Sequence, residues 1–249
     1  MTLQDALDRI TERLDEETTP IYWTSQEFVD ALNYVLRLFA LLTLWKEVTA
    51  NFTLVASQCF HNILSHPSTP LADFIVPLRF TVGGKRLKTA SVHQLNLLNP
   101  FWTVTPETAV LDLTNTLSIV PEYYAVLGCD LLAVYPQDDA GVTARLTYAA
   151  SPTPLSLSSL SAVLDAPLAY HACCLDFAIL VLMQKVGGQE FANEIPRLKV
   201  FLEEAGRLAG IVRTRMIAQG YERVPFDLTA YDQSALFKIR LAQQPKMAA

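Results

Sequence analysis

Apolar residues at the start of the chain recur at the spacing of an amphipathic helix. The first stripe advances by four, three and four positions: Leu3, Leu7, Ile10 and Leu14. Further on, Thr24 and Glu27 have the spacing of a capping box, in which each side chain binds the backbone amide of the other residue. The apolar stripe that follows over Phe28–Leu42 predicts a second helix.

From about Val48 the helical spacing gives way to short apolar runs bounded by turn residues, a pattern that predicts β-strands. The pair Gly83-Gly84 supplies the positive φ angles of a tight hairpin between Phe74–Val82 and Lys85–Thr89. A second hairpin is expected between Tyr123–Leu127 and Leu131–Tyr135. Ser91–Leu98 is expected to form a short helix between the strands. We expect strands in the following segments: Phe52–Val55, Cys59–Leu64, Phe74–Val82, Lys85–Thr89, Tyr123–Leu127, Leu131–Tyr135 and Val142–Ala149.

Helical spacing returns after a linker rich in proline and serine over Ser151–Ser161. One apolar stripe runs through Leu168–Val186, and another runs through Phe191–Met216. Pro196 interrupts the second stripe, so it either lies in the first turn of a helix capped by Asn193 or kinks a longer helix.

Together these elements predict a mainly α fold with a β-rich insertion. It would consist of a four-helix core, a β-hairpin module and an extended C-terminal tail. The expected boundaries place the helical core at 1–47 and 160–220, the β-rich insertion at 48–159 and a docking tail at 221–249. The tail is expected to dock because its scattered aromatic residues cannot form a core alone.

Composition excludes several classes of function. No stretch reaches the roughly 18 uncharged apolar residues of a membrane span, so no membrane partner is expected. The first eight residues contain two acids, which is unlike a secretion signal. The chain has 19 basic and 25 acidic residues, and a net charge of −6 argues against a free-standing nucleic-acid binder. Its four cysteines form no CxxC pair, which indicates free thiols.

We searched the sequence for catalytic, cofactor and metal motifs and predict none of these sites. The four histidines are dispersed, and His171, Cys173 and Cys174 do not converge on one ion at helical spacing. Gly83-Gly84-Lys85 lacks the spacing of a phosphate-binding loop. Among the acids, only Asp176 lies inside an apolar stretch, where it is more typical of an outward-facing residue or of an ion pair with Lys185 or Arg197.

The last predicted helix is basic on the face opposite its apolar stripe. This face is either a solvated surface with Glu203 and Glu204 as partners, or a surface that meets an acidic protein or DNA phosphate. Its basic residues, with one just beyond the helix, are Arg197, Lys199, Arg207, Arg213, Arg215 and Arg223.

Several short motifs follow one another in an order that resembles a known family. The opening helix ends in Arg13-Leu14-Asp15, and Tyr22–Glu27 leads into the second helix. The later motifs are Gly84–Leu87, Glu122–Tyr124, Leu132–Pro136, Tyr148–Pro152 and the helix after Ala166–His171. Over residues 1–220 this arrangement resembles the head-to-tail connector (adaptor) proteins of tailed bacteriophages. That family has a similar aromatic loop before a capped helix that begins W-S/T-x-x-E.

The resemblance implies a virion protein of the neck, at the head–tail interface, made in the host cytoplasm. It implies a helical core that assembles with copies of itself into a ring, commonly dodecameric. The ring would lie beneath the portal protein, meet a tail or nozzle protein and prolong the DNA channel. DNA would pass without sequence-specific binding, and the acidic balance suits this role because a channel for sliding DNA should repel phosphate.

Composition, rather than any motif, nominates the contact residues. Four residues of the tail are expected to bind the portal or a neighbouring subunit: Phe226, Tyr231, Phe237 and Arg240. Four residues of the β-rich insertion are expected to bind the next tail component: Lys85, Arg86, Lys88 and Trp102.

Three other functions remain open on this sequence. One is a component of the tail tube or a stopper, in which the β-rich part forms the ring. Another is an assembly factor that is absent from finished particles. The third is a phage hydrolase that works through Asp176 or His171, for which no triad or metal set was found.

Overall fold

The computed structural model describes residues 1–14, 22–103, 121–137, 141–221 and 223–227. These residues form two compact units, which we call the helical unit and the β unit. The helical unit consists of Met1–Thr43, Pro152–Thr214 and the described part of Pro225–Ala249. The β unit consists of Leu44–Ser151 and Arg215–Val224, so it includes the last residues of the final helix.

Amphipathic stripes account for the helices of the helical unit. Its described elements are α1 (Leu3–Arg13), α2 (Ser25–Thr43), a 3-10 turn η1 (Leu168–Tyr170), α4 (His171–Met183) and α5 (Gly188–Ala218). The predicted helices at the start of the chain are confirmed. Thr24 and Glu27 make the predicted capping box, with the Thr24 amide 2.7 Å from Glu27 Oε2 and the Glu27 amide 3.2 Å from Thr24 Oγ1.

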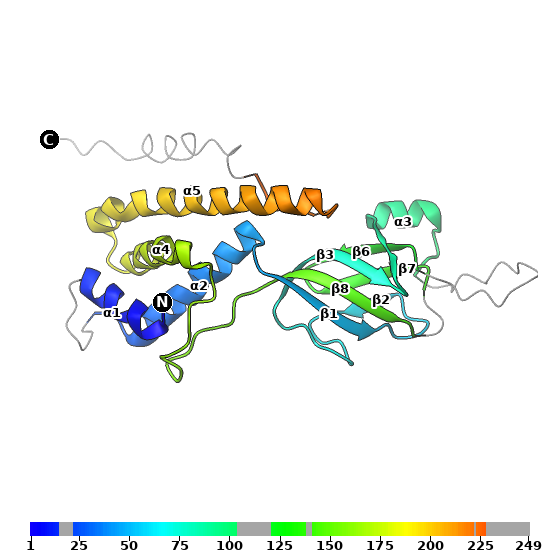
Figure 1. Ribbon diagram of the computed structural model, residues 1–249, viewed down its shortest axis with the longest axis horizontal. Coiled ribbons are helices and arrows are strands. Elements are labelled where there is room, and N and C mark those ends of the chain that lie inside the picture. Colours follow the sequence, from blue (N-terminus) through cyan, green and yellow to red (C-terminus); the bar gives the residue numbers. More distant parts are fainter. Residues whose placement is uncertain (15–21, 104–120, 138–140, 222, 228–249) are drawn as a thin grey trace, which may run out of the picture. The chain divides into compact units, whose positions relative to one another are not determined.

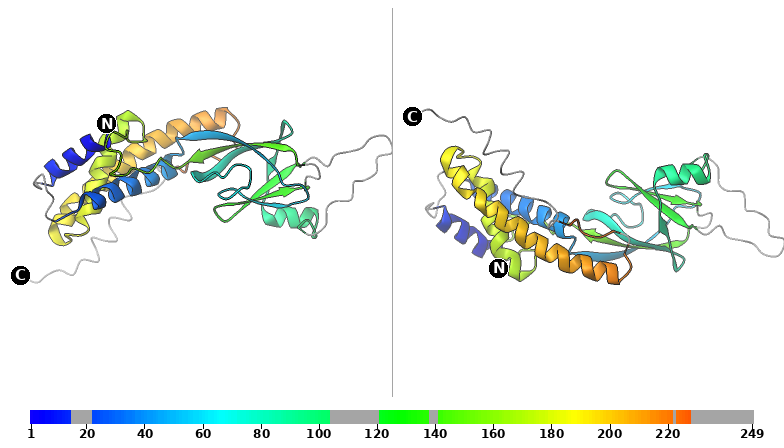
Figure 2. Two further views of the ribbon diagram at one scale, coloured as in Figure 1. Left: turned by 90° about the horizontal axis from the view of Figure 1, so that it is seen from below. Right: turned by 90° about the horizontal axis from the view of Figure 1, so that it is seen from above.

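Helix α4 is the central helix of this unit (Figures 1 and 2). Nine of its thirteen residues are buried, and they lie on all sides of the helix rather than on one stripe. Burial on every side is typical of a helix surrounded by other elements. Here α1, α2 and α5 surround it, with Phe39 of α2 and Phe177 of α4 both in contact with the ring of Phe201 on α5.

Helix α5 runs without a break through Pro196. It begins at Gly188, two turns earlier than a cap at Asn193 would allow, so the Asn193 alternative is wrong. Proline removes one intrahelical hydrogen bond. The helix continues because a buried stripe on its next turns packs against the unit: Phe201, Ala205, Ala209 and Val212.

The β unit contains two four-stranded sheets in its described residues. The first sheet has the strand order β1-β8-β3-β4, and the second has the order β2-β7-β6-β5. The strands are β1 (Glu47–Thr53), β2 (Phe60–Asn62), β3 (Phe74–Val82), β4 (Lys85–Arg86), β5 (Lys88–Thr89), β6 (Tyr123–Leu127), β7 (Leu131–Tyr135) and β8 (Thr143–Ala150). The short helix α3 (Val92–Leu98) follows β5 and confirms the predicted helix there.

The chain crosses from one sheet to the other at Leu87. β4 pairs with β3 across the Gly83-Gly84 turn for only two residues, and β5 then pairs with β6 of the second sheet. The predicted hairpin between Phe74–Val82 and Lys85–Thr89 is therefore correct only at its turn. The other predicted hairpin, β6 with β7, is confirmed over all five residue pairs.

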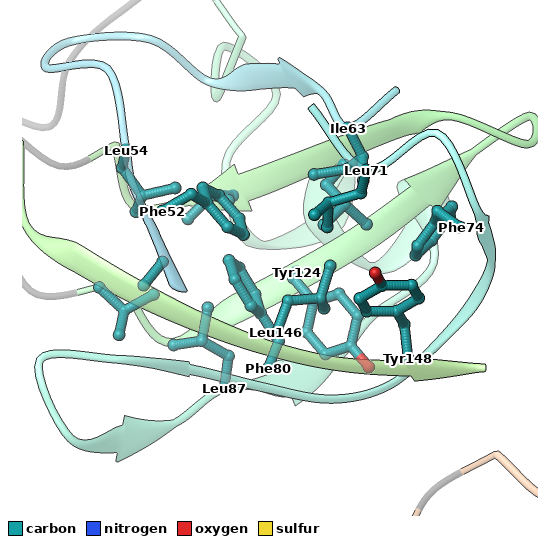
Figure 3. Close-up of a cluster of buried hydrophobic side chains, with 14 of the residues drawn as sticks. Phe52, Leu54, Ile63, Leu71, Phe74, Phe80, Leu87, Tyr124, Leu146 and Tyr148 are labelled. Carbon is teal, nitrogen blue, oxygen red and sulfur yellow. The ribbon is translucent and has the colours of Figure 1, made fainter. Parts of the chain in front are cut away.

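The two sheets enclose the main core of the β unit (Figure 3). Phe80 of β3 in the first sheet and Tyr124 of β6 in the second have ring centroids 5.6 Å apart. Phe52 stacks on Phe80 at 5.9 Å. A smaller cluster covers the far face of the second sheet, where Leu95 of α3 and Trp102 pack with residues of β6 and β7. The second sheet is thus buried on both faces.

The predicted fold class is wrong. Among the described residues, helices account for 42% and strands for 22%, and the strands form two sheets around their own core. This is a mixed α/β fold rather than a four-helix core with a small hairpin module. The difference arises because β1 pairs with β8, almost a hundred positions later in the chain, and local patterns do not reveal such pairing.

Candidate functional site

Asp176, the one acid in an apolar stretch, forms ion pairs with two arginines. Its carboxylate contacts Arg13 of α1, and its Oδ1 lies 3.0 Å from Nη1 of Arg197 on α5. The predicted pair with Arg197 is therefore confirmed, and the alternative pair with Lys185 is not formed. Asp176 thus connects α1, α4 and α5, which is a structural role for a carboxylate.

The residues considered as metal ligands serve local structure. His171 Nε2 lies 2.8 Å from the carbonyl oxygen of Ala166, and its ring is buried. Cys173 donates to the carbonyl of Tyr170 at 3.1 Å. A hydrogen bond between Cys173 and Cys174 lowers the pKa of the first thiol and raises that of the second. Within the described ranges, no group of three or more histidine, cysteine or acidic side chains gathers around a common point.

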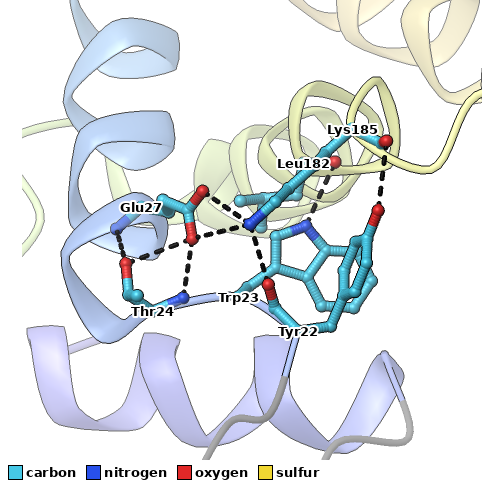
Figure 4. Close-up of polar contacts among 6 residues, drawn as sticks. All are labelled: Tyr22, Trp23, Thr24, Glu27, Leu182 and Lys185. Atoms are coloured by element: carbon cyan, nitrogen blue, oxygen red, sulfur yellow. Dashed lines mark hydrogen bonds and ion pairs between the residues drawn. The ribbon is translucent and has the colours of Figure 1, made fainter.

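The aromatic loop before α2 is bound to the end of α4 (Figure 4). Trp23 Nε1 donates to the carbonyl of Leu182 at 3.2 Å, and the Tyr22 hydroxyl donates to the carbonyl of Lys185 at 3.2 Å. Lys185 Nζ returns bonds to the Tyr22 carbonyl at 2.8 Å and to Glu27 Oε1 at 2.9 Å. The Thr24 amide and then Lys185 hold the pKa of Glu27 below its ordinary value.

This network explains why the aromatic and capping residues occur together in the sequence. The loop residues close the α2 N-terminus and also bind two carbonyls at the end of α4 and just beyond it. These are the carbonyl of Leu182, which accepts the Lys185 amide at 3.0 Å as well, and the carbonyl of Lys185. Beside the network lies a shallow depression of about 300 Å³. Its wall contains Trp23, Asp30, Tyr34, Val181 and Lys185.

The three basic residues nominated in the β unit lie around the Leu87 corner and all have partners within the chain. Lys85 Nζ is 2.8 Å from Glu122 Oε1, and Lys88 Nζ lies 5.8 Å from the centre of the Tyr123 ring. Arg86 Nη2 donates to the carbonyl of Gly220 at 2.5 Å. Lys85 and Lys88 keep exposed ammonium groups, whereas Arg86 holds the segment after α5.

Trp102 is a core residue, only 2% exposed, and its Nε1 donates to Asn96 Oδ1 at 2.7 Å. In this conformation it offers no surface to a partner. The neighbouring Phe101 is 66% exposed, and Leu97 and Leu98 at the end of α3 are exposed as well. We call Leu97, Leu98 and Phe101 the α3 patch. Sequence reasoning missed it, although a helix that buries Leu95 must turn Leu97, two positions further on, away from the same face.

The segment after α5 is fastened to the outer face of the first sheet, inside the β unit. Arg79 of β3 donates to the carbonyl of Gln219 at 3.1 Å, and its guanidinium lies 5.1 Å from the centre of the Tyr221 ring. The Tyr221 hydroxyl donates to Glu47 of β1, which also pairs with Arg215 at 3.5 Å. Burial and then the Glu47 contact raise the pKa of Tyr221.

The basic face of α5 is largely paired with acids of the same chain. Arg207 lies 2.7 Å from Glu204, and Lys199 lies 3.8 Å from Glu203. These contacts confirm the partners expected for a solvated face. The same face also exposes two large apolar side chains, Ile211, which is 65% exposed, and Val200.

Only one of the four nominated tail residues lies in the described part of the chain. Phe226 is 64% exposed, and Asp227 beside it pairs with Arg213 of α5 at 3.0 Å. Tyr231, Phe237 and Arg240 lie outside the described residues. Within the described ranges, no helix is both long enough and apolar enough to cross a membrane.

Comparison with known proteins gives the family. A search of the curated proteins found no match. The family model described as SU10 adaptor protein matches residues 1–224, which include all the described helices and strands of both units. The chain belongs to the SU10 adaptor protein family and is a structural adaptor of a bacteriophage particle.

Proposed function

We propose that this adaptor assembles into a dodecameric ring that joins the portal to the tail and extends the DNA channel. The family supports a structural role in the virion and contact with other virion proteins. The ring, the portal and the channel are the finer parts of the proposal, and they rest on the resemblance of the sequence to head-to-tail connectors.

The observation that carries the proposal is that each unit exposes its own large apolar side chains. The β unit exposes the α3 patch, and the helical unit exposes Tyr34 and Leu41 on α2 and Val200 and Ile211 on α5. Groups of exposed apolar residues mark protein-interaction surfaces when they lie together. Separate groups on two units suit a protein that must bind more than one component.

We assign the β unit to the tail component. Its candidate surface is the α3 patch, with Lys85 and Lys88 contributing positive charge from strands of the same unit. The C-terminal tail, which contains Phe226, Tyr231, Phe237 and Arg240, is assigned to the portal or to a neighbouring subunit. The net charge of −6 supports passage of DNA without binding, because repeated copies repel phosphate.

The test is quantitative mass spectrometry of purified particles, with the portal protein as internal reference. We expect the two chains in a ratio near one to one. Absence of this chain from mature particles would overturn the proposal and favour an assembly factor. A ratio far from one to one, with the chain found along the tail, would favour the tail-tube alternative.

Deletion of 225–249 gives a second test. The variant should keep the circular dichroism and thermal unfolding of the full chain, because all the buried residues of the described chain except Pro225 precede the deletion. It should be missing from particles. Normal incorporation of the shortened chain would show that the tail does not dock.

A further inference from the structure

Strand β1 lies at one edge of the first sheet, and within the described residues it pairs with another strand on one side only. It pairs antiparallel with β8 from Glu47 to Thr53 without a register shift. At the two ends of this pairing, the Ala150 amide donates to the Lys46 carbonyl at 2.9 Å and the Leu54 amide donates to the Val142 carbonyl at 3.1 Å. Even-numbered residues therefore bond to β8, and the backbone groups of the odd-numbered residues point to the open edge.

The open edge is covered over only half its length. Ser68 Oγ accepts from the Thr53 amide, and Thr69 Oγ1 donates to the Asn51 carbonyl, both at 3.4 Å. In the described chain, no hydrogen bond reaches the backbone of Glu47 or Thr49 from that side. The strand also lacks the proline, lysine or bulge that usually protects an edge.

The side chains on the inner face of β1 do not cover the main core of the β unit completely at this edge. Val48 and Ala50 point toward the main core but are only partly buried. The outer face of the strand presents Glu47, Thr49 and Asn51, which are polar. An occupant of the edge must therefore be a strand that alternates apolar and polar side chains, with the apolar ones extending the core.

Outside the described residues, the C-terminal tail contains a segment of this kind whose polar side chains are basic and therefore suit the face that carries Glu47. Phe237, Ile239 and Leu241 alternate with Lys238 and Arg240. Phenylalanine and isoleucine favour strands. An added strand with this pattern would place its three apolar side chains beside Val48 and Ala50 and its two basic side chains on the face of Glu47.

We propose that Phe237–Leu241 of one copy adds as a strand to the open edge of β1 in a second copy. The inference rests on the proposed function, because only an assembly of several copies needs contacts that join one copy to the next. A strand exchanged from copy to copy joins subunits through a repeated contact, which a closed ring can satisfy in full. In the added strand, Phe237 would lie on the inner face and Arg240 on the outer face, so the proposal accounts for two residues that were chosen from composition alone.

Cysteine cross-linking in purified particles tests which residues meet. The full chain carries Thr49→Cys and Lys238→Cys, in a Cys129→Ser background because Cys129 is exposed. A short thiol cross-linker should produce covalent dimers and higher multimers. The matched control combines Lys238→Cys with Lys85→Cys on β4, at the opposite end of the same sheet, and should give no product.

Each other result overturns the proposal in a different way. A cross-linked monomer would show that the tail folds onto β1 of its own copy. No product from either pair, in particles that contain the chain, would show that the tail does not meet this edge while leaving the adaptor function intact. Absence of the unmodified chain from particles would instead refute the proposed function itself.

Proline substitution tests strand addition directly. Thr49→Pro removes an amide that points to the open edge and leaves the backbone bonds to β8 in place. It also removes one side-chain hydrogen bond, between Thr49 Oγ1 and Thr147 Oγ1 at 3.1 Å. The variant should fold normally and lose about tenfold in incorporation, the effect of roughly 1.4 kcal/mol on an association. Ala50→Pro is the control, since it removes a bond to β8 and should unfold the β unit. Full incorporation of folded Thr49→Pro chain would refute strand addition.

Discussion

Arg79 Nη2 donates to the carbonyl of Gln219 at 3.1 Å, immediately after the last residue of α5. The final carbonyls of a helix lack intrahelical partners and carry partial negative charge. An arginine on a strand therefore satisfies a group that α5 cannot satisfy alone. Arg86 does the same for the carbonyl of Gly220, so the outer face of the first sheet holds the end of this helix.

Replacing Arg79 with methionine should loosen this attachment. The change removes the charged hydrogen bond to Gln219 and the contact with the Tyr221 ring, and it should lower the free energy of unfolding by about 1–2 kcal/mol. Hydrogen exchange of amides 215–221 should become faster. The control is Arg145→Met, which removes an exposed arginine from β8, and unchanged exchange in both variants would contradict the prediction.

Replacing Asp176 with asparagine should destabilise the helical unit. The carboxylate is 27% exposed and pairs with Arg13 and Arg197, so part of its interaction is screened by solvent. We expect a loss of about 1–2 kcal/mol, seen as a melting temperature about 2–6 °C lower. In a double-mutant cycle with Arg197→Met, the effects should be less than additive. Strict additivity would show that the pair contributes nothing.

The capping network around Glu27 should make the protein sensitive to acid. The Thr24 amide and then Lys185 lower the pKa of Glu27 in the folded state. Its contribution to stability is therefore present above the ordinary pKa of about 4.5 and is lost as pH falls through the lower folded value. Glu27→Gln should be less stable at pH 7 and should show a shallower decline in acid. Urea unfolding at several pH values measures this, with the exposed Glu203→Gln as control.

His66 should make the β unit sensitive to a milder fall in pH. Its ring is buried, packs 4.7 Å from the Phe52 ring and has Nδ1 3.0 Å from Ser68 Oγ. Burial lowers its pKa, so below about pH 6.5 the unfolded chain takes up a proton that the folded chain resists. Stability should fall between pH 7.5 and 5.5 in the wild type and fall less in His66→Gln. The exposed His93→Gln should behave as the wild type does.

Local spacing predicted the helices because residues three and four positions apart form the buried face of a helix. The capping box at Thr24 and Glu27 and the buried stripe of α5 are of this kind. Local spacing also predicted the β6–β7 hairpin, but it did not predict the partners of strands that are far apart in the sequence. Lys85–Arg86 and Lys88–Thr89 are adjacent in sequence yet belong to different sheets, and only the distant β6 determines this.

The candidate contact residues show a similar limit. Composition alone does not distinguish Phe101 from Trp102, although one side chain is exposed and the other is buried between α3 and the second sheet. Arg86 is charged and was therefore expected to contact a partner protein. It instead donates a hydrogen bond to the carbonyl of Gly220, more than a hundred positions away in the chain. Exposure depends on tertiary packing, which no local pattern contains.

Phe101 and Trp102 therefore provide a matched pair that separates stability from partner binding. Trp102→Ala removes a buried ring and its bond to Asn96, and it should lower the free energy of unfolding by about 3–5 kcal/mol. Phe101→Ser removes an exposed ring and should change stability by less than about 0.5 kcal/mol. If the α3 patch binds the tail component, Phe101→Ser particles should nevertheless fail to attach tails, which electron microscopy would show as tailless heads. Normal tail attachment by this folded variant would exclude Phe101 from the contact.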